Sequence, residues 1–175
     1  DLKNIIKKKT FKNLKFNSMP LLMGVLNVTP DSFSDGGKFL NNTFAKKQIN
    51  KLLKDGASII DLGGESTRPG ADDINHNIEW RRVESKLKFL EKKNCFTSLD
   101  TRKSEIMKKS KKFNIGLIND ISGLRYDKNT INFLQKNKTP FVLHHMQGNP
   151  KSMQINPKYK NVLLDIYDFF EERIK

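Results

Sequence analysis

Five short apolar segments alternate with five segments of helical pattern along this chain, and this alternation constrains its fold more than any other feature. The apolar segments read as continuous hydrophobic runs, which is typical of parallel strands covered by helices on a buried sheet. They are PLLMGVLN (20–27), SIIDL (58–62), CFTSL (95–99), IGLI (115–118) and PFVLH (140–144). We therefore expect an α/β protein, and 175 residues suffice to bury one sizeable core.

The segments between these strands carry helix signals. Apolar residues recur at helical spacing in 41–57, where Gly56 is a stop signal, and in 77–93. Further helices are expected in 100–113, with Thr101 as the N-cap, in 128–137, and from about Asn161. Two architectures fit this order: an open doubly wound sheet, or the first five βα units of an eight-stranded TIM barrel.

Each predicted strand stops in a polar residue. These residues are Asn27, Asp61, Asp100, Asn119 and the pair His144–His145. Parallel strands bring their carboxyl ends to one face, and in barrels the active site lies there, whereas a doubly wound sheet concentrates its site at one switch point. Five polar strand ends therefore favour the barrel. Adjacent histidines on a strand point to opposite faces, so we expect at most one to face a ligand.

The loop GGESTRPG, residues 63–70, has the composition of a ligand-binding turn. Its glycines permit sharp turns, and we expect Glu65, Ser66, Thr67 and Arg68 to be presented outward between them. The arginine fork suits phosphate or carboxylate groups. A mobile surface loop without a ligand is the alternative, because the loop has neither the P-loop lysine nor the GxGxxG spacing.

Three strand-end residues suit a polar ligand. The Asp100 carboxylate and the Asn119 amide can accept from and donate to a flat heterocycle with amino and oxo groups. Each also has a structural alternative, since Asp100 could cap a helix and Asn119 could bond nearby backbone. The Asn27 amide oxygen is a possible ligand for Mg²⁺, which binds mainly through waters and substrate phosphates.

Composition limits the partners and the compartment. The net charge is +14, but lysines spread over helical faces supply most of it, without the arginine and aromatic interleaving of RNA-binding modules. We therefore expect no nucleic-acid partner, and no apolar run is long enough for a membrane helix. One cysteine in the chain favours a reduced, cytoplasmic setting. We expect a basic lead-in at 1–19 and one domain at 20–175, and both chain ends read as cut.

The motifs MGVLNVTPDSFSDGG, GGESTRPG, DTRKSE, INDISG and HHMQGNPKSMQ together closely resemble dihydropteroate synthase, from about Pro20 to the last residue. The resemblance implies a TIM barrel, a homodimer and a Mg²⁺-dependent step of folate biosynthesis. In that step 6-hydroxymethyl-7,8-dihydropterin diphosphate condenses with 4-aminobenzoate, and diphosphate is released. The substrates implied are thus two small molecules.

The resemblance also implies roles for single residues. Asn27 matches the metal and diphosphate asparagine, and Asp100 and Asn119 match the pterin-binding aspartate and asparagine. Ser66, Thr67 and Arg68 match the mobile second loop, at the diphosphate and aminobenzoate sites. The first mobile loop, which closes over aminobenzoate, is matched by Thr29, Pro30, Asp31, Ser32 and Phe33.

The chain departs from the family pattern in two places. His144 stands where the family has a methionine that packs on the pterin, so we expect His144 in the pterin pocket. The family's second pterin aspartate, the lysine of its SRK motif and its terminal arginine and histidine have no counterpart here, so we expect this chain alone to be inactive. Two alternatives remain open: a pterin-dependent methyltransferase of the same barrel, and a non-catalytic pterin-binding or basic binding module.

Overall fold

The computed structural model describes residues 10–11, 14–15, 20–29, 41–66, 68, 71–93, 95–149 and 152–175. Its centre is one five-stranded parallel sheet with the strand order β3-β4-β5-β6-β7. The strands are β3 (Met23–Asn27), β4 (Ile59–Gly63), β5 (Phe96–Asp100), β6 (Ile115–Asp120) and β7 (Phe141–Leu143). Every strand lies beside its predecessor in the chain, with no reversal of order. Consecutive barrel units have this order and a doubly wound sheet does not, so the predicted barrel-type fold is confirmed.

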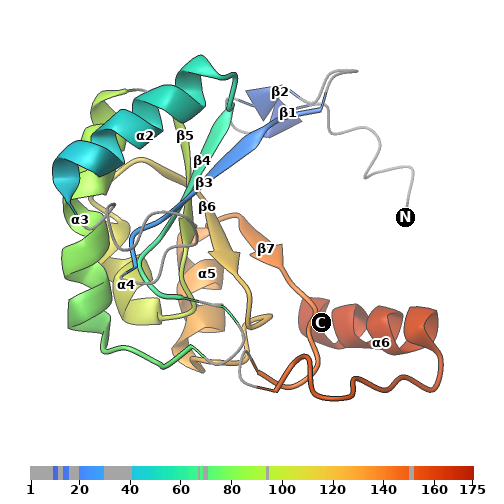
Figure 1. The fold of residues 1–175 in the computed structure, drawn as a ribbon. Helices are drawn as coiled ribbons and strands as arrows, with labels where there is room; N and C mark the ends of the chain where they lie inside the picture. Colours follow the sequence, from blue (N-terminus) through green and yellow to red (C-terminus); the bar gives the residue numbers. More distant parts are fainter. Residues whose placement is uncertain are drawn as a thin grey trace.

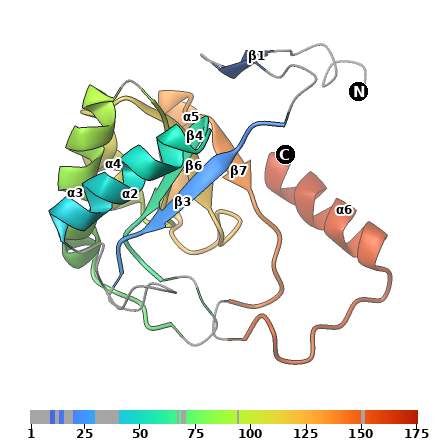
Figure 2. The same cartoon turned by 45° about the horizontal axis from the view of Figure 1, so that its top comes forward.

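A helix follows each strand of the sheet, as the alternation of the sequence predicts. The helices are α2 (Asn42–Lys54), α3 (His76–Lys92), α4 (Ser104–Ser110), α5 (Asn129–Asn137) and α6 (Val162–Ile174). The first four of these cover one face of the sheet, whereas α6 stands apart beyond β7 at the end of a long connection (Figures 1 and 2). Within the lead-in, β1 (Thr10–Phe11) and β2 (Leu14–Lys15) pair antiparallel.

Local sequence explains most helix ends. Asn41, Asn75 and Asn161 are N-caps whose side-chain oxygens accept from backbone N–H groups of the first turn. Gly56 follows α2 with a φ of 99°, a conformation that favours glycine, so the predicted stop is confirmed.

The predicted N-cap at Thr101 is wrong. Helix α4 begins at Ser104, and its backbone N–H donates to the carboxylate of Asp127, which lies in another loop. Thr101 instead lies buried and donates its hydroxyl to Glu79 Oε1 at 2.5 Å. A side chain 23 residues away therefore serves the end of this helix, which no local pattern reveals.

The core lies between the sheet and its helices. Leu26, Leu62, Leu99 and Ile118 form one row across four strands, and each is at most 1% exposed. Because side chains alternate across the pleat, the neighbouring residues point to the opposite face. On that face Val25 is 55% exposed. Among the described residues, no helix is long and apolar enough to span a membrane.

Candidate functional site

The carboxyl ends of four strands carry a row of polar groups. Strand register places Asn27, Gly63, Asp100 and Asn119 side by side, on the face opposite the helices. Their positions follow from the last core row, because each lies one residue beyond Leu26, Leu62, Leu99 or Ile118. The structure thus brings together the three residues that the sequence assigns to a polar ligand.

Gly63 gives this row its shape. A Cβ atom on Gly63 would lie 2.9 Å from Asn27 Oδ1 and 3.1 Å from Asp100 Oδ2. The two oxygens therefore flank a gap that exists because residue 63 has no side chain. Among the described residues, neither oxygen has a hydrogen-bond partner, so both can serve a ligand or a cation at the open end of the sheet.

The Asp100 carboxylate lies in an environment that opposes its ionisation. Burial raises its pKa well above the ordinary value, and the nearby charges of Asp61, Glu79, Asp120 and Glu65 add to the shift. A carboxyl group with a raised pKa and no neutralising neighbour is typical of a functional site, because a bound ligand can supply the missing interactions.

Asp61 belongs to this site, although the sequence placed it at a strand end and gave it no ligand. It lies in the middle of β4, two residues before Gly63, and is 4% exposed. Asn119 Nδ2 donates to Asp61 Oδ2 at 3.1 Å, and the bond crosses over β5. The signal that could have found it is a carboxylate within the otherwise apolar segment SIIDL.

The beginning of the GGESTRPG loop is fixed by a buried ionic network. Glu65 is not presented outward as predicted; it is 4% exposed and accepts from Lys103 Nζ at 2.6 Å and from Arg102 Nε at 2.9 Å. Lys103 also contacts Glu79 at 3.0 Å. Burial alone would lower the pKa of Lys103, but the charges of Glu79 and Glu65 raise it above its ordinary value.

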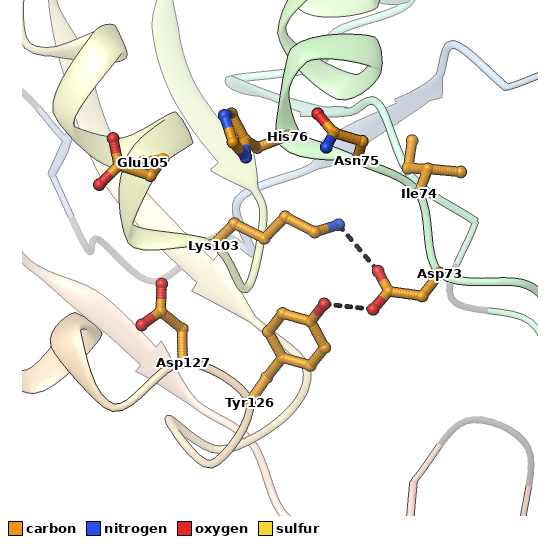
Figure 3. Close-up of a pocket in the computed structure, with 8 residues that line it drawn as sticks. All are labelled: Asp73, Ile74, Asn75, His76, Lys103, Glu105, Tyr126 and Asp127. Carbon is orange, nitrogen blue, oxygen red and sulfur yellow. Dashed lines mark hydrogen bonds and ion pairs between the residues drawn. The ribbon is translucent and has the colours of Figure 1, made fainter.

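The outer side of this network borders a pocket of about 490 Å³. Lys103 Nζ lies 3.3 Å from Asp73 there, and the Tyr126 hydroxyl donates to the same carboxylate (Figure 3). The Arg102 guanidinium stacks 4.0 Å from the centre of the Tyr126 ring. The network therefore joins the loops after β4, β5 and β6, and it fixes the beginning of the second loop.

The other predicted site residues fall in two groups. Thr29 is buried and Ser66 and Arg68 are partly buried, so the described parts of both loops begin at the carboxyl end of the sheet. Thr67 and the first-loop residues Pro30, Asp31, Ser32 and Phe33 lie outside the described residues.

The two histidines do not lie on a strand, because β7 ends at Leu143. His144 is exposed. The His145 ring packs edge-on against Phe169 of α6, with the centroids 4.9 Å apart. Contact with the helix, not strand alternation, thus sets the direction of His145, and the role of His144 in a pterin pocket stays a prediction.

Sequential parallel strands with a polar row at their carboxyl ends define the class: a βα-barrel-type protein with a polar site for a small molecule. The family model described as "Pterin binding enzyme" matches residues 23–175. The chain belongs to this pterin-binding enzyme family.

Relatives of known function are similar to this chain in sequence or in fold. Dihydropteroate synthase of Haemophilus influenzae is 41% identical over 157 residues, which are 89% of this chain and 57% of that protein. The Yersinia pestis dihydropteroate synthase, solved with a sulfonamide drug complex, superposes with a TM-score of 0.87 at 40% identity, covering 94% of this chain and 60% of that one. The Xanthomonas albilineans enzyme, solved with 4-aminobenzoic acid, has a TM-score of 0.75 at 36% identity, covering 90% and 55%. The chain thus spans little more than half the length of these relatives.

Proposed function

We propose that the protein containing this chain is a dihydropteroate synthase, which joins 6-hydroxymethyl-7,8-dihydropterin diphosphate to 4-aminobenzoate and releases diphosphate. The observation that carries the proposal is the row of Asn27, Asp100 and Asn119 at the carboxyl ends of β3, β5 and β6, with Gly63 of β4 between the first two. Similarity to synthases at about 40% identity supports the same reaction.

Different residues of the row would bind different parts of the pterin substrate. Asp100 and Asn119 offer a carboxylate and an amide to the amino and oxo groups of the pterin ring. Asn27 lies at the end of the row, where it can hold the diphosphate end of the same molecule through a cation. Arg68 and Thr67 of the second loop add a cationic fork and a hydroxyl for the leaving diphosphate.

Magnesium fits the Asn27 position. The Asn27 oxygen flanks the gap above Gly63, and the described residues hold no cluster of three or more His, Cys, Asp or Glu side chains suited to a metal. A hard cation would therefore rest on one amide oxygen, substrate phosphates and water, which is the usual manner of Mg²⁺. When bound, it would stabilise negative charge on the leaving diphosphate.

The reaction then needs little acid–base chemistry from the chain. The amine nitrogen forms a bond to the pterin methylene carbon, the bond from that carbon to the diphosphate oxygen breaks with its electron pair, and the amine proton passes to solvent. The Asp100 carboxylate would help to stabilise the positive charge that develops on the pterin as the bond breaks. Closure of the loop at 29–33 over aminobenzoate would exclude water.

The test is synthesis of dihydropteroate by the complete protein that contains this sequence. Both substrates with Mg²⁺ should give product and diphosphate in equal amounts, and neither should form without aminobenzoate. Binding of pterin without any binding of aminobenzoate would favour the methyltransferase alternative. We also propose a cytoplasmic homodimer, which sedimentation of the purified protein and fractionation of its source cells would test.

A further inference from the structure

Asp61 is a buried acidic group beside the polar row, and the proposed reaction leaves it unused. It is 4% exposed, and its side chain lies one layer deeper than Asn27, Asp100 and Asn119. Its Oδ2 accepts from Asn119, whereas its Oδ1 is buried and has no hydrogen-bond partner among the described residues. The Ser98 hydroxyl, beside Asp61 in the strand register, is likewise buried without a partner.

Such an arrangement is costly for the fold. A buried carboxylate needs several hydrogen bonds or a cation. Among the described residues Asp61 accepts one hydrogen bond of good geometry, from Asn119, and has the Ser98 hydroxyl close by. Burial accordingly raises the pKa of Asp61. An apolar residue at this position of an apolar strand would serve the sheet better, so stability of the sheet alone does not account for an acid here.

The hydrogen bond from Asn119 to Asp61 determines how the Asn119 amide is oriented. Asn119 turns its NH₂ toward Asp61, because Nδ2 donates to Oδ2, and an oxygen without a proton can only accept. The amide is planar and its oxygen diverges from its nitrogen. The Asn119 Oδ1 atom is therefore held on the side away from Asp61, where no described residue donates to it.

We infer that Asp61 is a positioning residue of the pterin site, which fixes the Asn119 amide so that its oxygen accepts from an N–H group of the bound heterocycle. This inference rests on the proposed function and goes beyond it, because it assigns the site a preference. The pocket selects a ring with an N–H or amino donor opposite Asn119 and rejects a ring with an acceptor there. Asp61 acts through Asn119 and need not touch the substrate.

The test is a double-variant cycle in the complete protein, with 6-hydroxymethylpterin as the probe and binding measured by calorimetry. Asp61→Ala removes the acceptor, and Asp61→Asn replaces it with a group that can donate or accept, so both free the Asn119 amide to turn over. We expect each to weaken binding about tenfold, in line with one unsatisfied buried polar group. Asn119→Ala should weaken binding by at least as much, and the double variant Asp61→Ala with Asn119→Ala no further than Asn119→Ala alone.

Leu62→Ala is the matched control, because Leu62 is the next residue of β4, fully buried on the opposite face. It should lower the unfolding midpoint and leave the affinity of the folded protein unchanged. Wild-type affinity in both Asp61 variants, or losses that add in the double variant, would overturn the inference alone. Failure of the wild-type protein to bind the probe would overturn the proposed function together with it.

Discussion

At the scale of single residues, the site depends on the gap between Asn27 and Asp100, which exists because Gly63 has no side chain. Asn27 and Asp100 converge on that gap from the two neighbouring strands. Their chemistry differs: the amide is neutral and suits a hydrated cation, whereas the carboxylate is buried among like charges. Substitution of Asn27 and substitution of Asp100 should therefore change different measured properties of the protein.

Asn27→Ala should separate metal-dependent binding from pterin binding. If Asn27 holds the diphosphate through Mg²⁺, its loss removes one oxygen ligand and leaves the ring contacts of Asp100 and Asn119 in place. Titration of the complete protein with diphosphate in the presence of Mg²⁺ should show weaker binding, while 6-hydroxymethylpterin alone binds almost as before. Equal loss of pterin binding without metal would instead mark Asn27 as structural.

Asp100→Asn should stabilise the ligand-free protein at neutral pH while weakening pterin binding. The folded-state pKa of Asp100 lies above the unfolded value, so the folded form holds the proton more tightly. Wild-type stability therefore falls as the pH rises from about 4 through the folded pKa, and the variant lacks this loss. We expect a gain of roughly 1–3 kcal/mol at pH 8 and a smaller one at pH 4, measured by urea unfolding. A difference that stays constant with pH would refute this account.

At the scale of elements, the loops after β4, β5 and β6 act as one unit. Lys103 contacts Glu65 and Glu79, which come from the second loop and from α3, and Asp73 and Tyr126 extend the network outward. Glu79 is fully buried and depends on the lysine for compensation. The network thus fixes where the GGESTRPG loop leaves the sheet.

Lys103→Met should destabilise the fold by about 3–5 kcal/mol, because it leaves the fully buried Glu79 carboxylate without a cation and Glu65 with Arg102 alone. The loss should be smaller at pH 5 than at pH 8, since burial raises the pKa of Glu79 and protonation can neutralise that carboxylate once the lysine is gone. Lys108→Met is the control: its partner Glu105 and the lysine are both about half exposed, and such pairs contribute roughly 0.2–1 kcal/mol. Denaturant unfolding of both variants at the two pH values tests this, and equal effects of the two changes would contradict it.

At the scale of the whole molecule, the sheet is covered on one face and open on the other. Val25 and Met23 are exposed on the open face of β3. Helix α6, which stands apart from the other helices in Figure 2, has no buried residue. On α6 the apolar side chains of Leu163, Leu164 and Ile174 are all more than half exposed. Two surfaces of the described chain thus carry apolar groups of the kind that associate in water.

Residues 1–175 expressed by themselves should therefore associate as their concentration rises, through the open face and the strand edges. We also expect no synthase turnover, because the resemblance assigns further pterin and diphosphate contacts to residues with no counterpart in this span. Light scattering over a dilution series and an assay of diphosphate release test the two statements. A monodisperse monomer that turns over both substrates would show that five βα units suffice.

The sequence by itself determined the five βα units, their parallel order and the meeting of Asn27, Asp100 and Asn119. Periodicity and caps are local, and parallel strands must bring their ends to one edge. Tertiary structure alone decided that Glu65 turns inward, that Thr101 donates to Glu79, and that Asp61 holds Asn119. These contacts join residues 22 to 58 positions apart, and they depend on strand register and on competition among buried charges for few partners. A local sequence pattern does not predict these contacts. They depend on which buried polar groups the fold brings within hydrogen-bond distance of one another.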